Sequence, residues 1–314
     1  MTNKRTDGLA VDDLMLTDGG LETVLVFHEG IDLPAFAAFP LLDSAEGRDA
    51  LLRYHREFLT IAADAGAGYV HETPTWRANP AWGAEVGYSA DGLRRIAFDS
   101  VAFGTSLRDE WSGTGGFLVS GCIGPRGDGY VPGTTMTPDQ AAAYHRTQVG
   151  DLADAGVDLV TSFTLPYADE GTGLVAAAAE AGVPVVVGFT LETDGRLPSG
   201  ESLGEAIEAV DAATGGYASW FMVNCAHPEH VLPALDGSAA WASRIGALRA
   251  NASRMTHAEL DEAEVLDDGD PDDLARGYVD LARLLPGLRV VGGCCGTDAR
   301  HVAAIGAAMT RAAG

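Results

Sequence analysis

Short apolar runs alternate with longer, alanine-rich segments of helical pattern eight times along this chain. Most of these runs are continuously apolar, which is typical of parallel strands that are buried on both faces. Eight such pairs within 314 residues predict an α/β protein, a (β/α)₈ barrel forming one domain over residues 1–314. The predicted strands are 14–18, 68–72, 116–121, 158–163, 183–189, 219–225, 243–251 and 288–295.

A doubly wound sheet is the alternative arrangement of the same alternating elements. The glycine-rich "DGGLET" at 18–23 lacks the spacing of a dinucleotide-binding turn, and the chain has no Walker A sequence, so the barrel is favoured. Thr137, Pro138 and Gln140 form a helix-start signal before one of the predicted helices. Those helices include 139–155, 201–213, 271–285 and 298–312.

The composition excludes several classes of protein. The net charge of −25 argues against nucleic-acid and anionic-membrane partners, because this surface would repel both. No basic segment precedes an apolar one at the start, and the apolar runs are far shorter than the ~20 residues needed to span a bilayer. We therefore expect a cytoplasmic protein with reduced thiols. The acidic surface fits either a salt-loving host or an ordinary solvated surface.

Three of the four cysteines follow the carboxyl ends of predicted strands. Cys225 ends the sixth strand, and Cys294 and Cys295 end the eighth, so a barrel would bring them to one rim. Three thiolates with an open fourth position describe a catalytic zinc site. The flanking glycines, such as Gly296, would let both neighbouring sulfurs turn to one metal. A vicinal disulfide or redox switch remains the alternative, and Cys122 is interpreted as a small buried apolar residue.

Three motifs in chain order resemble one known family. "TDGGLET" (17–23), "VNC" (223–225) and "GGCCGT" (292–297) are similar to the homocysteine S-methyltransferase family, which includes betaine-dependent enzymes and a module of methionine synthase. The resemblance covers essentially the whole chain. It implies a zinc-dependent barrel that moves a methyl group from an onium donor to a thiol.

The resemblance also implies roles for particular residues. Cys225, Cys294 and Cys295 would hold zinc, and the substrate thiol would take the open position. Asp18 would lie near the substrate or shape the pocket, while Gly19 and Gly20 would allow tight backbone turns beside the zinc.

One position departs from the family pattern. Where the family commonly has a glutamate that binds the amino group of homocysteine, this chain has Phe163, whose apolar ring cannot neutralise an ammonium. Glu72, at the end of the second strand, is the nearest candidate to replace it. Asn251 is a further candidate substrate contact. In betaine-dependent enzymes a tyrosine can occupy the open coordination position of the zinc. Arg77 falls near the place of that tyrosine, and an arginine cannot ligate zinc.

Other side chains have weaker predicted roles. Trp76, Trp82 and Tyr167 are candidates to hold a cationic donor through cation–π contacts, or to pack in the ordinary way. His227 is predicted to begin a helix, and an outer-sphere role beside Cys225 is the alternative. His71 is a candidate outer-sphere residue of the site.

These observations predict a methyltransferase that makes methionine from homocysteine with S-methylmethionine or S-adenosylmethionine as donor. Because of Phe163, another thiol is the main alternative acceptor. A zinc-binding barrel without catalysis and a thiol-redox protein are the alternatives from other classes. The sequence leaves homo-oligomerisation open.

Overall fold

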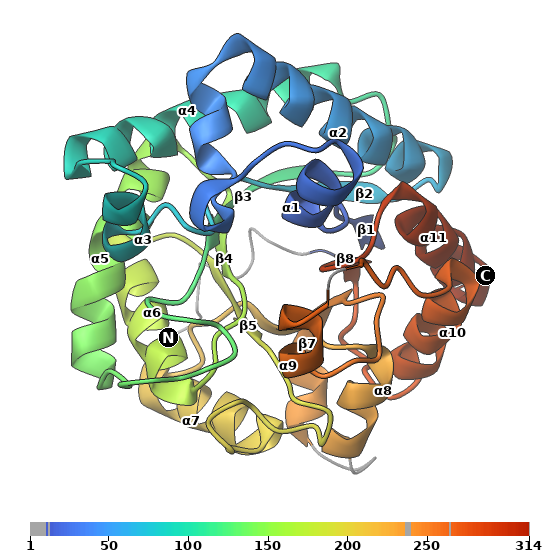
Figure 1. Ribbon diagram of the computed structural model, residues 1–314. Helices are drawn as coiled ribbons and strands as arrows, with labels where there is room; N and C mark the ends of the chain where they lie inside the picture. Colours follow the sequence, from blue (N-terminus) through green and yellow to red (C-terminus); the bar gives the residue numbers. More distant parts are fainter. Residues whose placement is uncertain (1–10, 12, 236–239, 264, 314) are drawn as a thin grey trace.

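In the computed structural model, eight parallel strands close into a barrel in chain order, and β8 pairs with β1 (Figure 1). The structure describes residues 11, 13–235, 240–263 and 265–313, so the predicted domain 1–314 extends beyond this part at both ends. The (β/α)₈ prediction is confirmed. The strands are β1 (Met15–Leu16), β2 (Gly68–Glu72), β3 (Phe117–Ile123), β4 (Leu159–Ser162), β5 (Val185–Phe189), β6 (Trp220–Asn224), β7 (Ile245–Ala250) and β8 (Val290–Gly293).

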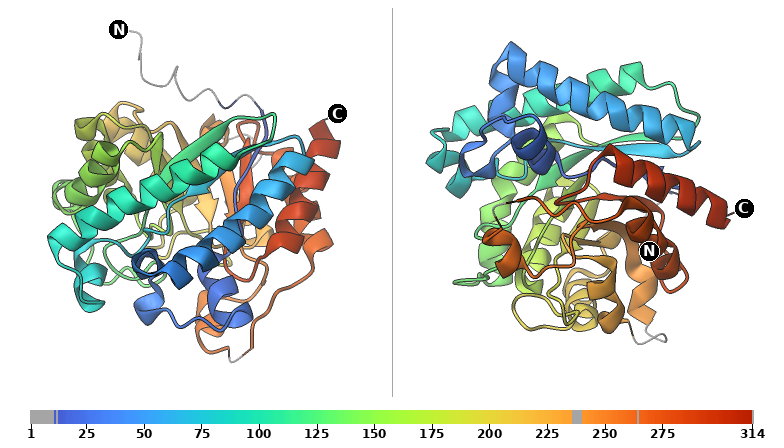
Figure 2. Two further views of the ribbon diagram at one scale, coloured as in Figure 1. Left: turned by 90° about the horizontal axis from the view of Figure 1, so that it is seen from above. Right: turned by 45° about the vertical axis from the view of Figure 1, so that its right-hand side comes forward.

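Most of the α-helices form a ring around the strands (Figures 1 and 2). The α-helices are α1 (Leu21–Thr23), α2 (Ala45–Asp64), α3 (Pro80–Glu85), α4 (Ala90–Glu110), α5 (Pro138–Ala155), α6 (Ala168–Ala181), α7 (Leu203–Thr214), α8 (Pro228–Val231), α9 (His257–Asp261), α10 (Pro271–Ala282) and α11 (Ala299–Ala313). A short π-helical turn spans Val24–His28. Short 3₁₀ turns span Pro34–Phe36, Phe39–Asp43, Leu232–Ala234 and Ala240–Arg244. Among the described residues, no helix combines the length and the apolarity needed to cross a bilayer.

Local sequence signals account for the helix ends. Thr137 caps α5 in a reciprocal capping box with Gln140, as the sequence predicts. His227 caps α8, where its Nδ1 accepts a hydrogen bond from the backbone N–H of Glu229. Gly156 ends α5 in the left-handed conformation, which glycine adopts without steric cost.

Several strands are shorter than predicted, most clearly at the last strand. β8 ends at Gly293, so Cys294 and Cys295 lie in the turn that follows rather than on the strand. β7 begins at Ile245, because residues 240–244 form a 3₁₀ turn. The residue pattern does not mark where the backbone turns out of the sheet, which is why it overestimates the length of these strands.

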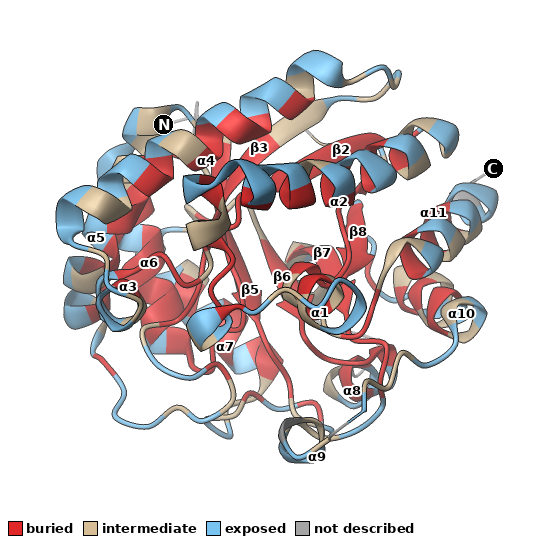
Figure 3. Cartoon of the chain, turned by 45° about the horizontal axis from the view of Figure 1, so that its top comes forward, coloured by how far each residue is buried: buried red, intermediate tan, exposed pale blue. Residues whose placement is uncertain are grey.

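The apolar core has two layers. One fills the space between the barrel and the helices, and the strands and inner helix faces are accordingly buried (Figure 3). The other fills the barrel interior, and its members include Met15, Cys122, Phe163 and Met222. Because the interior is packed, it serves as the floor of any site above it, and Cys122 is the buried apolar residue that the sequence predicts.

Candidate active site

A cavity of about 500 Å³ lies at the carboxyl ends of the strands. The short helices α1 and α9 lie at the opening of the barrel, next to this cavity (Figure 1). The predicted metal ligands and the predicted substrate-binding residues line the cavity: Asp18, Gly19, Gly20, Glu72, Phe163, Cys225, Asn251, Cys294 and Cys295. The fold therefore brings together segments from both ends of the chain.

Three thiols converge at one side of this cavity. The Sγ atoms of Cys225, Cys294 and Cys295 all lie within 4.8 Å of one another, so this group could hold a metal ion. The Sγ atoms of Cys225 and Cys295 are 3.9 Å apart. Cys225 and Cys294 are joined as a disulfide, with 5.5 Å between their Cα atoms. Cys294 thus pairs with the distant Cys225 and not with its neighbour Cys295.

The backbone around the thiols is held in unusual conformations. Cys225 has φ 52°, a left-handed conformation that is rare outside glycine, and its N–H donates to the carbonyl of Arg249 at 3.0 Å. Gly296 follows the cysteine pair with φ 77° and allows the turn there. Thr164, after β4, is also left-handed at φ 55°, and its N–H donates to Asn224 Oδ1 at 2.9 Å. Such strain concentrates at functional sites.

The aspartate–glycine–glycine element packs directly against the turn that carries Cys294. A Cβ on Gly20 would lie 2.5 Å from the carbonyl oxygen of Cys294, so only glycine permits this approach. The N–H of Gly20 donates to the carbonyl of Thr297 at 3.0 Å, and the N–H of Gly293 donates to that of Asp18 at 2.8 Å. The element therefore fixes the position of the thiols.

Arg249 is a central residue of the site that was not predicted from the sequence. It lies on β7, is buried, and forms an ion pair with Asp18 (Nη2 to Oδ1, 2.6 Å). Its Nε donates to the carbonyl of Gly293 at 2.8 Å and its Nη2 to that of Gly19 at 2.9 Å. Tyr54 donates to the other carboxylate oxygen of Asp18 at 3.2 Å. A lone arginine inside the apolar run 245–250 was the available signal.

Two acidic side chains of the cavity have no cationic partner within ion-pair distance among the described residues. Burial raises the pKa of Glu72 to about 7, and its Oε2 atom has no hydrogen-bond partner in the described structure. Burial likewise raises the pKa of Glu22 to about 7. Phe163 lies in the same cavity, with its ring 5.1 Å from the guanidinium carbon of Arg249. The cavity lining thus contains a buried carboxylate, Glu72, with one oxygen that has no hydrogen-bond partner among the described residues.

Asn251 and two aromatic side chains complete the rim beside the thiols. The Oδ1 atom of Asn251 is buried without a hydrogen-bond partner among the described residues. The ring of Tyr130 stacks on that of His257 with their centroids 4.0 Å apart, and both residues line the cavity. Neither ring was singled out from the sequence, because Tyr130 lies in a loop and His257 begins the short helix α9, and neither belongs to a recognised motif.

The predicted aromatic residues separate into different environments. Trp76 lines the cavity, and its Nε1 donates to Thr164 Oγ1 at 3.2 Å. Trp82 and Tyr167 lie outside the lining; the Tyr167 hydroxyl instead accepts a hydrogen bond from the N–H of Met136 at 3.1 Å. His71 does not line the cavity; its ring contacts that of His55, at a centroid distance of 4.5 Å.

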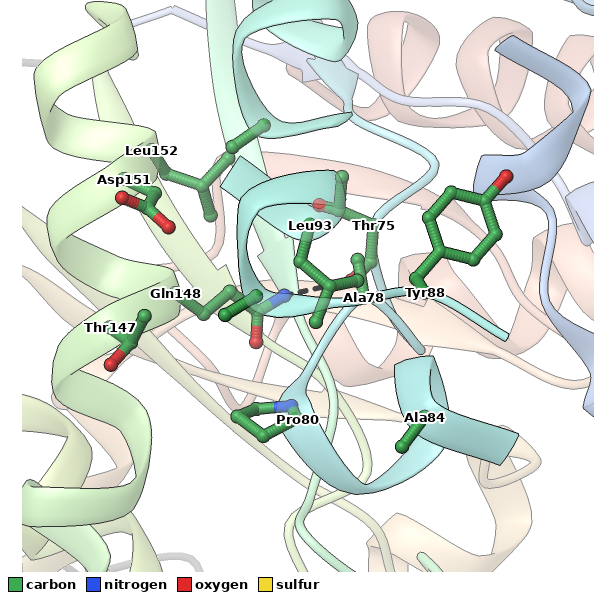
Figure 4. A pocket seen from close by; sticks show the side chains of 12 residues that line it. Thr75, Ala78, Pro80, Ala84, Tyr88, Leu93, Thr147, Gln148, Asp151 and Leu152 are labelled. Carbon is green, nitrogen blue, oxygen red and sulfur yellow. Dashed lines mark hydrogen bonds between the residues drawn. The ribbon is translucent and has the colours of Figure 1, made fainter. Parts of the chain in front are cut away.

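A second, smaller cavity of about 190 Å³ lies outside the barrel between α3, α4 and α5 (Figure 4). There the side chain of Gln148 donates a hydrogen bond to the carbonyl of Thr75 at 2.9 Å (Figure 4). Thr75 in turn donates to the carbonyl of Cys122 at 2.7 Å. These bonds anchor the loop after β2, which carries Trp76 and Arg77.

A closed (β/α)₈ barrel with convergent thiols and charged side chains above its strand ends has the architecture of a barrel enzyme with a site able to hold a metal. Residues 15–309 match the family model described as homocysteine S-methyltransferase, and the chain belongs to that family.

Similar proteins support this membership. Homocysteine S-methyltransferase 1 of Arabidopsis thaliana is 25% identical over 98% of this chain and 95% of its own length. The crystal structure of the Escherichia coli homocysteine methyltransferase in its oxidised form has a TM-score of 0.73 and 25% identity, covering 94% of this chain and 96% of the other. The metallated form of that protein has a TM-score of 0.71 with the same identity and coverage.

Proposed function

We propose that this chain transfers a methyl group from S-methylmethionine or S-adenosylmethionine to the thiol of homocysteine and so forms methionine, with zinc held by Cys225, Cys294 and Cys295. The convergence of these three thiols in a member of this family carries the proposal. A cytoplasmic location, where thiols stay reduced, is part of it. Small molecules would be its only partners, and homo-oligomerisation stays open.

The donor set fits zinc. Sulfur ligands about 2.3 Å from a tetrahedral zinc ion lie about 3.8 Å from one another, and the Sγ atoms of Cys225 and Cys295 are 3.9 Å apart. A two-electron reductant such as an external thiol would have to reduce the disulfide, freeing both Cys225 and Cys294, before either could act as a zinc ligand. A relative with both a metallated and an oxidised form is consistent with these two states.

Zinc, when bound, would supply an open position at which the acceptor thiol, with an ordinary pKa of about 8.5, is held as a thiolate. The residues of the chain align the substrates. Glu72, at its raised pKa, would bind the ammonium that Phe163 cannot bind, once it is ionised. Asp18 is neutralised by Arg249, so it would shape the pocket through Gly19 and Gly20. Asn251 Oδ1 would accept one substrate N–H.

No protein group has to neutralise the positive charge of the donor during the reaction. A sulfonium becomes a neutral thioether as its methyl group leaves, and the acceptor thiol gains the methyl group and loses one proton. In-line alignment of the two sulfur atoms is therefore the main requirement.

Methyl transfer to a different thiol is the second candidate, and Phe163 favours it. In the family this position commonly carries a glutamate for the amino group, while here the ring lies beside Arg249. An acceptor without an ammonium would suit an apolar neighbour.

The deciding experiment is zinc analysis of the reduced protein, followed by a methyl-transfer assay with homocysteine and S-methylmethionine. We expect one zinc per chain, and methionine formation that is lost in Cys295→Ala. Cys122→Ala is the matched control, since Cys122 lines the same cavity outside the thiol group. Zinc without methionine would redirect the assignment to another thiol. Absence of zinc from the reduced protein would contradict the mechanism and leave a thiol-redox protein as the alternative.

A further inference from the structure

Arg77 has an unusual environment at the edge of the cavity. Its guanidinium carbon lies 4.0 Å from the centroid of the Trp76 ring and 3.7 Å from that of the Trp82 ring. The residue is 8% exposed and lines the cavity. Its Nη1 donates to the carbonyl of Gly127 at 3.4 Å. The two indoles therefore fix the plane of the guanidinium.

This guanidinium lacks the partner that a buried arginine usually has. Among the described residues, no carboxylate lies within ion-pair distance of Arg77, and its buried Nε has no hydrogen-bond partner. Asp128, Glu22 and Glu85 face it from the surrounding loops and helices only at longer range. A buried cation without a paired anion is costly, whereas a planar guanidinium matches a carboxylate with two parallel hydrogen bonds. The unpaired edge is suited to an anionic ligand.

The same geometry excludes the tryptophans as a cage for the donor's cation. Trp76 and Trp82 both stack on Arg77, so an onium group placed there would meet a positive charge. The onium end of a donor would instead face the unpaired acids of the cavity, such as Glu22.

We infer that Arg77 binds the carboxylate of the methyl donor. This inference rests on the proposed function. The donor is assigned here, and not the acceptor, because Arg77 lies on the loop after β2, whereas Glu72 ends β2 and Phe163 directly follows β4. Arg77, Tyr130 and Cys295 line the same cavity, and Tyr130 interacts electrostatically with both of the others, so this subsite and the thiols open to one ligand space.

The test compares ligands that differ only in the carboxylate. Binding of S-methylmethionine and of its decarboxylated analogue, 3-aminopropyl dimethylsulfonium, is measured by isothermal titration calorimetry on the reduced, zinc-loaded protein. We expect the analogue to bind about 10- to 100-fold more weakly, as for loss of a charge-assisted pair. Arg77→Met should weaken S-methylmethionine binding by a similar factor and leave analogue binding within about threefold. Arg283→Met, an exposed arginine on the outer surface, is the matched control.

Three results would overturn the inference. The unmodified protein could bind both donors equally, or Arg77→Met could discriminate between them as strongly as the unmodified protein does. Arg77→Met could also lose its preference for homocysteine over 3-aminopropanethiol instead, which would assign Arg77 to the carboxylate of the acceptor. If Arg77→Met fails to fold, Arg77→Lys keeps the charge without the planar fork and should show partial loss. The comparison of the two donors on the unmodified protein is a test that needs no variant. Donor discrimination without any methyl transfer would refute the proposed function while leaving the carboxylate subsite in place.

Discussion

Arg249 connects three strand ends of the site through one guanidinium. It pairs with Asp18 and donates to the carbonyls of Gly19 and Gly293, so β1, β7 and β8 meet at this residue. Gly293 directly precedes Cys294 in the chain. The ion pair is buried, and removal of one partner of such a pair leaves an uncompensated charge.

Arg249→Met should therefore lower the free energy of unfolding by about 3–5 kcal/mol, measured by urea denaturation. Arg53→Met removes the exposed pair with Glu29 and should cost at most about 1 kcal/mol. The double variant Asp18→Asn, Arg249→Met should recover part of the loss, because no unpaired charge remains. An effect of Arg249→Met as small as that of Arg53→Met would contradict the role given to the buried pair.

Glu72 should control how the enzyme responds to pH. Its raised pKa of about 7 means that it is neutral below pH 7 and charged above it, so kcat/KM for homocysteine should rise with pH through about 7. Glu72→Gln should lower kcat/KM by about 10- to 100-fold and remove this step. Glu46→Gln, on the exposed face of α2, is the control. An acceptor thiol without an amino group should be unaffected by Glu72→Gln, and equal losses for both acceptors would count against ammonium binding.

At the scale of elements, α2 and β2 meet through two histidines. The rings of His55 and His71 are 4.5 Å apart and fully buried, and none of their four nitrogens has a hydrogen-bond partner among the described residues. Burial lowers the pKa of His55 to about 3 and that of His71 well below its usual range. Both therefore pack as neutral rings rather than serve the site.

This packing makes stability depend on pH. Both folded-state pKa values lie below the unfolded value of about 6.5, so the unfolded chain binds more protons below that pH. The free energy of unfolding should be highest above pH 6.5 and fall by up to about 1.4 kcal/mol per pH unit for each histidine toward pH 4. His55→Leu should flatten this slope in urea titrations, while His28→Gln, at an exposed position, should not. An unchanged slope in His55→Leu would exclude His55 as a cause.

At the scale of the whole molecule, the charge of −25 opposes compactness. Ion pairs such as Arg56–Glu110 and Arg146–Glu180 are exposed and contribute little each, so repulsion among the excess carboxylates outweighs their attraction. Added salt shortens the range of this repulsion.

The melting temperature should therefore rise by several degrees between 0.1 and 1 M NaCl, as measured by calorimetry. The rise should shrink at pH 5, where protonation of carboxylates reduces the net charge. A melting temperature that falls with salt would mean that the surface ion pairs outweigh the repulsion.

Much of the fold could be predicted from the sequence because its signals are local. All eight strands and the capping box at Thr137 follow from hydrophobic runs and capping residues a few positions apart. The convergence of Cys225, Cys294 and Cys295 follows from the same pattern, since parallel strands in a barrel end at one rim. Strand ends were less accurate, because a hydrophobic run does not mark the residue at which the backbone turns out of the sheet.

The sequence by itself determined the barrel, its rim of thiols and the absence of a glutamate at Phe163. Only the tertiary structure decided which side chains pair, bond or stack with one another across that rim. Asp18 and Arg249 form an ion pair although they are 231 residues apart. Cys294 pairs with the distant Cys225 rather than with the adjacent Cys295. Arg77 stacks on the two indoles that were predicted to hold a substrate cation. Periodicity fixes the face on which a residue lies, but partners on different strands and loops are set by barrel closure, which no local pattern encodes.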